Sequence, residues 1–128
     1  MHILRRLPVG RVLAATAGVL TLSAVGCAPS GEPVENEVLM RSIAFDPPEI
    51  TIRVGETVTW TNRDLVPHTA TSGNPGEVGL GSIFRSAFLL QGQRFTHTFN
   101  EAGEFVYFCE VHPAMMRDAK VIVQEEGQ

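Results

Sequence analysis

Short runs of alternating apolar and polar residues fill the chain beyond residue 37. In residues 57–61, Val58 and Trp60 fall on one face, and in residues 95–99 the aromatic side chains share a face with His97. A repeat of two residues is typical of a β-strand with one buried face. The pattern predicts strands in eight segments: 38–43, 50–54, 57–61, one beginning in 68–71, a short one within 82–90, 95–99, 104–108 and 119–124.

Turn-forming residues separate these segments. Pro47-Pro48 ends the first run, Gly55-Glu56 separates two others, and the glycine-rich stretch 72–81 predicts a loop. No stretch shows the spacing of an amphipathic helix. We therefore predict an all-β fold, a β-sandwich of about seven to eight strands, over residues 38–128. His97 is assigned a structural role, because its spacing belongs to a strand face.

The densest chemistry of the chain lies in the segment Tyr107–Met116. It contains the spacing Cys109-x-x-His112-x-x-Met115, which offers a thiolate, an imidazole and a thioether. His68 can supply a second imidazole from a distant part of the chain. Two histidines, one cysteine and a weakly bound methionine form the ligand set of a blue-copper electron-transfer centre. The sequence therefore predicts one copper ion that cycles between Cu(I) and Cu(II).

On these residues the sequence resembles the cupredoxins, and the short gap between His112 and Met115 is more similar to amicyanins than to plastocyanins. The likeness extends over most of residues 38–124, including Val54–Asn62 and Pro67-His68. It implies a Greek-key sandwich with a type 1 copper at one end. It also implies that His68, Cys109 and His112 are the strong ligands and that Met115 is the axial one. Met116 competes for the axial place, although we expect it to pack on the surface or against the core.

The resemblance also assigns roles around the ligands. His112 is expected to be the electron port, within a small docking patch formed with Pro67, Pro113 and Ala114. Met116 is a weaker candidate for that patch.

Thr69 and Asn62 are expected to support the ligands through hydrogen bonds. Relatives often carry Asn where this chain has Thr69, and the Asn side chain links the two ligand loops. We expect the Thr69 hydroxyl to make this link by bonding to backbone near Cys109. Glu110, between two ligands, is expected to point to solvent, because a carboxylate on the copper would favour harder ions.

Other functions need residues that the chain does not offer. Structural zinc prefers four strong nitrogen or sulfur ligands. A copper reductase needs a second copper with several further histidines, and only His97 remains for it in the domain. A binuclear copper centre needs two bridging cysteines, and the domain has only Cys109. Copper delivery or buffering, for which Met115-Met116 is the one hint, stays open as an alternative.

The first 26 residues predict a signal peptide of the lipoprotein type. Three arginines precede a weakly apolar run that is shorter than the roughly 20 residues of a membrane-spanning helix. Leu22–Cys27 resembles a bacterial lipobox, so Cys27 is predicted to carry lipid, with residues 27–37 as a linker. Twin-arginine export, an uncleaved membrane span and a Cys27–Cys109 disulfide are the less favoured alternatives.

Removal of this leader changes the charge of the chain. It contains three of the ten basic residues and none of the fourteen acidic ones, which leaves seven against fourteen and a net charge of −7. This charge argues against nucleic acid. It is compatible with a basic protein partner, and equally with an acidic surface that maintains solubility.

Together these features predict a lipid-tethered single-electron carrier, not an enzyme, on the periplasmic or other extracytoplasmic face of the cell envelope. Its expected partners are redox proteins such as c-type cytochromes, oxidases or dehydrogenases, and the carrier is expected to be a monomer.

Overall fold

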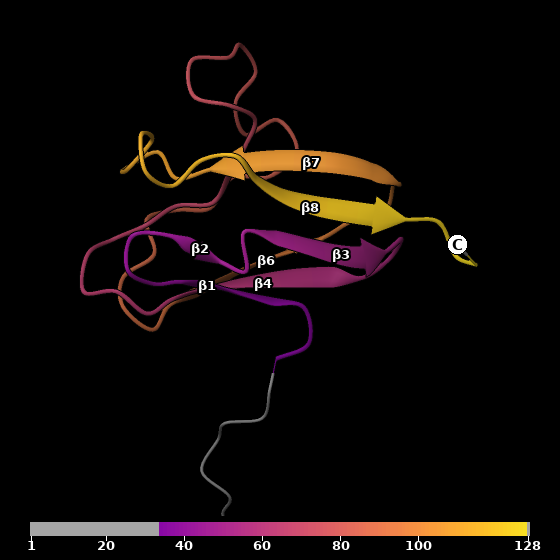
Figure 1. Cartoon of the computed structure of the whole chain (residues 1–128), viewed down its shortest axis with the longest axis horizontal. Helices are drawn as coiled ribbons and strands as arrows, with labels where there is room; N and C mark the ends of the chain where they lie inside the picture. The colour runs from indigo at the N-terminus through magenta and orange to yellow at the C-terminus, as the bar shows by residue number, and fades with distance from the viewer. Residues whose placement is uncertain (1–33, 128) are drawn as a thin grey trace, which may run out of the picture. The chain divides into compact units, whose positions relative to one another are not determined.

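The computed structural model describes residues 34–127 (Figure 1). These residues contain eight β-strands, joined by loops and turns, and no helix. No helix within this range is long and apolar enough to cross a membrane. The strands are β1 (Glu37–Met40), β2 (Phe45–Asp46), β3 (Glu49–Arg53), β4 (Thr57–Asn62), β5 (Thr71–Ser72), β6 (Arg94–Thr98), β7 (Gly103–Phe108) and β8 (Ala119–Gln124).

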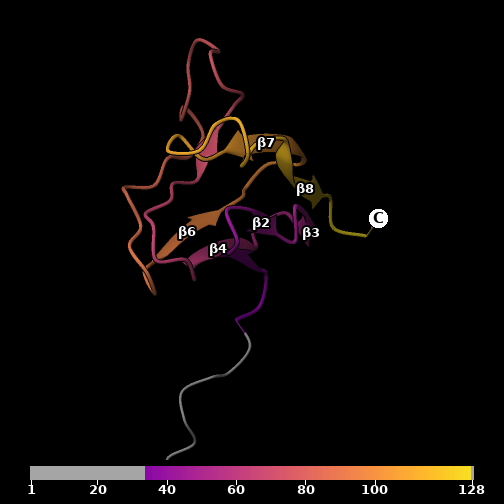
Figure 2. The same ribbon diagram turned by 60° about the vertical axis from the view of Figure 1, so that its left-hand side comes forward.

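The strands form two four-stranded sheets that pack face to face (Figures 1 and 2). One sheet has the order β2-β1-β4-β6, and the other has the order β3-β8-β7-β5. β1 runs parallel to β4 and β3 runs parallel to β8, while the other neighbours are antiparallel. The predicted all-β sandwich is confirmed.

Three predicted strands differ in the structure. The first, predicted over 38–43, ends at Met40, because Ser42 and Ile43 turn the chain with φ near 55° and 53°. Residues 82–90 make only isolated bridges, at Arg85 and Leu89, instead of a strand. Phe84 and Leu89 are nevertheless buried, so this segment fills the core with side chains while its backbone stays irregular. The strand predicted to begin in 68–71 is reduced to β5, and β2 was not predicted, because two residues are too few to show a repeat.

Trp60 is the centre of the core between the sheets. It is fully buried, and its ring lies 5.0 Å from that of Phe84 and 5.5 Å from that of Tyr107. Burial raises the pKa of the Tyr107 hydroxyl, which keeps it neutral. Since Tyr107 lies two residues before Cys109 on β7, this packing fixes the strand that carries the predicted thiolate.

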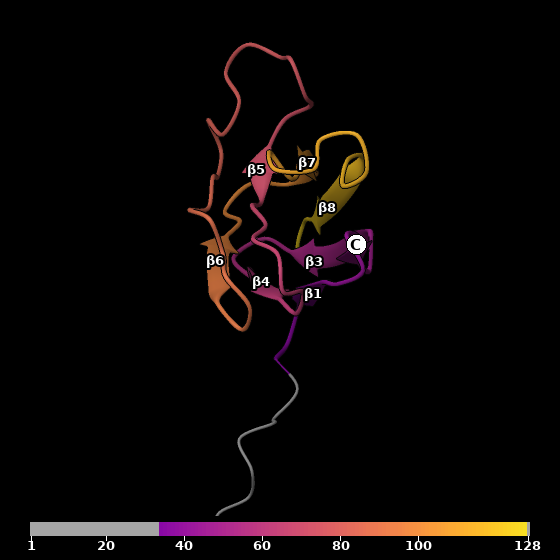
Figure 3. The same ribbon diagram turned by 90° about the vertical axis from the view of Figure 1, so that its left-hand side faces the viewer.

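Loops from both sheets gather at one end of the sandwich, which we call the site end. It is formed by residues 41–44, 63–70, 86–93 and 109–118, and it faces the viewer in Figure 3. The Asn62 side chain connects two of these loops, because its amide donates to the carbonyls of Val66 at 2.8 Å and Leu89 at 2.7 Å. The opposite end, which we call the turn end, carries the turns 54–56 and 99–102 and residues 125–127.

His97 lies on β6, away from the predicted ligands. Its ring packs 5.3 Å from that of Phe84 and 4.8 Å from that of Phe99, so its role as part of a strand face is confirmed. Burial lowers the pKa of His97 below its ordinary value of 6.5.

Acidification is expected to destabilise the fold through His97. Below the ordinary pKa, the unfolded chain binds a proton that the folded chain does not bind, so stability falls as the pH drops. His97→Gln is expected to reduce the loss of unfolding free energy between pH 7 and pH 5 by up to about 1 kcal/mol. Urea unfolding of both metal-free proteins at a series of pH values measures this. Identical pH profiles of the two proteins would contradict the prediction.

Candidate metal centre

The side chains of His68, Cys109 and His112 converge at the site end. One donor atom of each lies within 4.8 Å of the others. The Cys109 sulfur is 3.8 Å from Nδ1 of His68 and 3.9 Å from Nδ1 of His112. In the part of the chain that the structure describes, this is the one group of three such side chains close enough to hold a metal ion.

Cys109 follows the last residue of β7 and opens a closed loop. Its backbone N–H donates to the carbonyl of Met116 at 2.8 Å. Within the loop, the N–H groups of Met115 and Met116 donate to the carbonyl of His112 at 3.0 and 2.9 Å. These bonds hold Cys109 and His112 on one short turn. Cys109 is fully buried and His112 is half-buried, so one ligand lies inside and the other reaches the surface.

A carboxylate binds the side of the His68 ring that faces away from Cys109. Its Nε2 lies 2.7 Å from Oδ2 of Asp64, while its Nδ1 faces Cys109. Because a carboxylate accepts hydrogen bonds, the proton belongs on Nε2 and Nδ1 keeps its lone pair for a metal. This role of Asp64 was not predicted from the sequence. The signal available was a carboxylate four residues before a predicted ligand.

Asp64 is itself fixed by the turn between β1 and β2. It accepts hydrogen bonds from the backbone N–H groups of Ser42 at 2.7 Å and Ile43 at 2.9 Å, two residues with φ near 55° and 53°. Burial alone would raise the pKa of Asp64, but the bonds from Ile43, His68 and Ser42 lower it below its ordinary value. The carboxylate therefore stays charged, and that charge faces the buried imidazole.

Thr69 joins the two ligand segments. Its backbone N–H points at the Cys109 sulfur, 3.3 Å away, and its hydroxyl accepts a hydrogen bond from the N–H of Glu110 at 2.8 Å. The second contact is the bond to backbone near Cys109 that the sequence predicts for a threonine at this position. Asn62 supports His68 through the backbone, since its side chain donates to the carbonyl of Val66, two residues before His68, and to that of Leu89, whose backbone pairs with that of His68.

The prediction that Glu110 points to solvent is wrong. Its side chain is only 28% exposed and forms an ion pair with Arg85, with contacts of 2.5 and 2.8 Å. The hydroxyl of Thr71 also donates to it, at 2.5 Å. Hydrogen bonds from Arg85 and Thr71 lower the pKa of Glu110 below its ordinary value. Glu110 therefore turns away from the ligands and attaches their loop to the rest of the domain.

The two adjacent methionines occupy opposite environments. Met115, which the spacing assigns to the axial position, is 64% exposed, whereas Met116 is 1% exposed and belongs to the core. Met116 therefore contributes nothing to the surface patch predicted around His112. The other residues predicted for that patch reach the surface: Pro113 and Ala114 are exposed, and Pro67 and His112 are half-buried.

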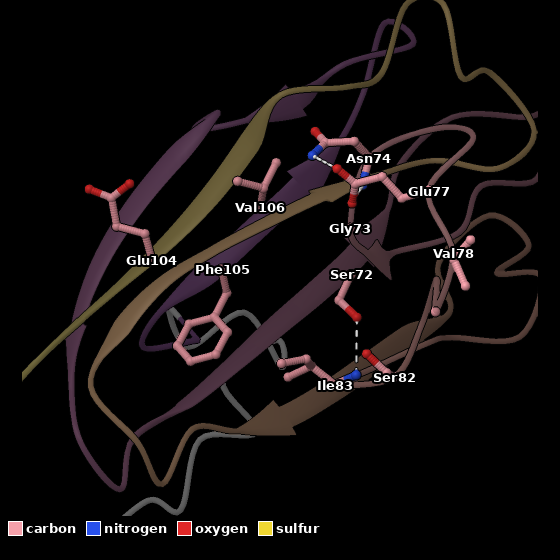
Figure 4. A pocket seen from close by; sticks show the side chains of 11 residues that line it. Ser72, Gly73, Asn74, Glu77, Val78, Ser82, Ile83, Glu104, Phe105 and Val106 are labelled. Atoms are coloured by element: carbon pink, nitrogen blue, oxygen red, sulfur yellow. Dashed lines mark hydrogen bonds between the residues drawn. The ribbon is translucent and has the colours of Figure 1, made fainter.

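A separate cavity of about 320 Å³ lies between the loop after β5 and strand β7. Figure 4 shows Glu77 turned toward Asn74, at 2.7 Å, and the Ser72 hydroxyl near the backbone of Ile83, at 3.2 Å. Neither histidine nor cysteine lines this cavity. Among the described residues, the candidate metal ligands therefore all lie at the site end.

The donor set fits copper. A thiolate and two imidazoles bind both Cu(I) and Cu(II), whereas structural zinc sites use four strong nitrogen or sulfur ligands. Here three strong donors converge, and two of them are buried in a framework fixed by hydrogen bonds. The fold and the donor set together define a copper-binding β-sandwich.

Comparison with known proteins agrees with this class. The family model for copper binding proteins of the plastocyanin/azurin family matches residues 33–124. An amicyanin from Paracoccus versutus is 44% identical over 77 residues, which cover 60% of this chain and only 55% of that protein. An amicyanin from Paracoccus denitrificans is 33% identical over 123 residues, covering 88% of this chain and 89% of the relative.

A solved structure gives the same result. A novel purple cupredoxin from Nitrosopumilus maritimus is 32% identical, with a TM-score of 0.60 over 70% of this chain and 100% of that one. The chain therefore belongs to the plastocyanin/azurin family of copper-binding proteins, the cupredoxins. The predicted signal peptide, Cys27 and the linker up to residue 33 lie outside the described residues.

Proposed function

We propose that this protein carries single electrons between redox proteins at the cell envelope, with one copper ion held by His68, Cys109 and His112. The convergence of their donor atoms within 4.8 Å is the observation that carries the proposal. Bound copper would supply one electron by cycling between Cu(I) and Cu(II). The protein is in this role a carrier and not an enzyme, and its partners are oxidases, dehydrogenases or c-type cytochromes.

The surrounding residues suit this role. Asp64 fixes the tautomer and orientation of His68, and the N–H of Thr69 stabilises a negative charge on the Cys109 sulfur. His112 is half-buried and is followed by exposed Pro113 and Ala114, so its ring provides a short path from the buried site to a partner. We assign the electron port to His112 and the docking patch to Pro67, Pro113 and Ala114.

Met115 is the proposed axial ligand, on the strength of its spacing from His112. Met116 is the second candidate, because it is buried beside Cys109 in the core while Met115 is 64% exposed. The axial residue tunes the reduction potential of such a site. Replacing each methionine by leucine and measuring that potential distinguishes the two candidates.

The cellular address is also part of the proposal. Cys27 follows a stretch that resembles a lipobox, so we propose lipid attachment there and a periplasmic or other extracytoplasmic location. A tether of about ten residues would keep the domain near membrane-bound partners. Mass spectrometry of the mature protein tests this, since an N-terminus at Cys27 without lipid would contradict it.

The absorption spectrum of the protein from Ala28 onward tests the electron-carrier role. Cu(II) is expected to produce an intense red-region band, from charge transfer between Cys109 and the metal, that bleaches reversibly on reduction. Cys109→Ser should abolish the band, whereas Ser82→Ala, at an exposed position away from the site, should leave it unchanged. A weak colour with Cu(II), or binding of Cu(I) alone, would favour copper delivery or buffering instead.

A further inference from the structure

We propose that the site end docks an acidic partner, whose carboxylates pair with Arg63 and Arg94 around an apolar contact. This inference rests on the proposed electron-carrier role and gives the partner its chemistry. The net charge of −7 on the chain without its first 26 residues is compatible with a basic partner, so net charge alone does not indicate an acidic one. The distribution of charge between the two ends of the sandwich supports it.

Exposed apolar side chains cover the loops of the site end. Leu65 is 86% exposed, Leu90 is 58% exposed and Val66 is 41% exposed. The Asn62 side chain binds the carbonyls of Val66 and Leu89, so the two loops that carry these residues lie side by side. We call these side chains, together with Pro67, Pro113 and Ala114 on the loops of the same end, the apolar face.

Two arginines flank this apolar face. Arg63 follows β4 directly and Arg94 begins β6, and these strand ends are neighbours because Arg94 pairs with Thr61 in the ladder. Both side chains are exposed, and within residues 34–127 neither forms an ion pair. Their charges are therefore available to a partner.

The carboxylates of the site end are already occupied. Asp64 binds His68 and two backbone N–H groups, Glu110 pairs with Arg85, and Asp118 pairs with Arg117 at 3.1 Å. The turn end has the opposite character, because Glu101, Glu125 and Glu126 are exposed there and no ion pair is found for them among the described residues. Unpaired carboxylates therefore outnumber the one unpaired arginine, Arg53, at the turn end, while Glu49 at the start of β3 is exposed and forms no ion pair among the described residues.

This separation of charge orients an approaching partner. An acidic protein is repelled by the turn end and attracted by the two arginines, so its encounters favour the end that carries His112. The apolar face then supports a contact that forms and dissociates quickly. A basic partner would be drawn to the turn end, where the buried ligands are out of reach.

Two small oxidants of opposite charge test the proposal in the copper-loaded protein. Stopped-flow oxidation of the reduced protein by anionic ferricyanide is expected to slow as salt rises, in spite of the negative net charge. Arg63→Glu and Arg94→Glu should each lower this rate about 3- to 10-fold at low salt and raise the rate with cationic tris(phenanthroline)cobalt. Arg53→Glu, the same charge change near the turn end, should alter both rates less than twofold.

Equal effects of Arg53→Glu and the two site-end variants would overturn the proposal, because net charge alone would then explain the rates. A binding experiment gives a readout that needs no electron transfer. NMR titration of the metal-free protein with poly-glutamate is expected to shift the amides around Arg63, Leu65 and Arg94, and poly-lysine those around Glu101. The reverse assignment contradicts the proposed partner, while failure to form the coloured copper site contradicts the electron-carrier role instead.

Discussion

Met116→Ala is expected to lower the free energy of unfolding of the metal-free protein by about 2–5 kcal/mol. Its side chain is 1% exposed and belongs to the same core as Trp60, Tyr107 and Cys109. Truncation removes buried apolar surface and leaves a cavity beside the ligand loop, and the surrounding structure relaxes into such a space only in part. Urea unfolding followed by tryptophan fluorescence, which reports on Trp60 alone, measures the loss.

The adjacent residue provides a matched control. Met115→Ala should change the unfolding free energy by less than about 0.5 kcal/mol, because Met115 is 64% exposed. In the copper-loaded protein we expect Met115, and not Met116, to determine the reduction potential. Met115→Leu should shift the reduction potential and Met116→Leu should leave it nearly unchanged. The opposite result would move the axial assignment to Met116.

Asp64→Asn is expected to weaken copper binding about 10- to 100-fold. The carboxylate accepts hydrogen bonds from Ser42, Ile43 and His68 through two oxygens, and an amide has only one oxygen and adds two donors. At least one of these donors would lose its acceptor, and His68 would lose the charge that fixes its orientation. The reduction potential should rise, because a negative charge near the imidazole stabilises Cu(II) more than Cu(I).

Competition with a chelator and a redox titration measure the two effects of Asp64→Asn. Glu56→Gln is the control, because Glu56 also accepts a backbone N–H, from Arg53 at 2.7 Å, but lies at the turn end. Thermal unfolding of the metal-free proteins separates damage to the fold from damage to the site. If Asp64→Asn alters stability but neither affinity nor potential, the carboxylate holds only the β1–β2 turn.

Local patterns were sufficient to predict most strands and the converging ligands. The repeats around Trp60 and His97 need only the pleat of a half-buried strand, and the spacing from Cys109 to His112 is local. His68 could be assigned because few histidines compete for its role. In each case the residue type and its spacing from its neighbours in sequence are sufficient for the prediction.

Partners that lie far apart in sequence were not predictable. Glu110 was predicted to face solvent because a carboxylate does not suit the copper, but the Arg85 that pairs with it lies 25 residues away. The spacing from Asp64 to His68 is local, but the backbone N–H of Ser42, which helps to fix the carboxylate, lies 22 residues earlier. The short strand predicted within residues 82–90 was wrong, because Phe84 and Leu89 are buried in the core while their backbone forms only isolated bridges.

The attachment of Glu110 to Arg85 and Thr71 bears on how the copper loop could be transplanted. Residues 109–116 close on themselves through the bond from Cys109 to Met116, which suggests a module that can be moved as one piece. The ion pair and the hydroxyl bond cross from this loop to two other segments. A graft that keeps its geometry in a new host therefore has to include residues from three separate stretches of sequence.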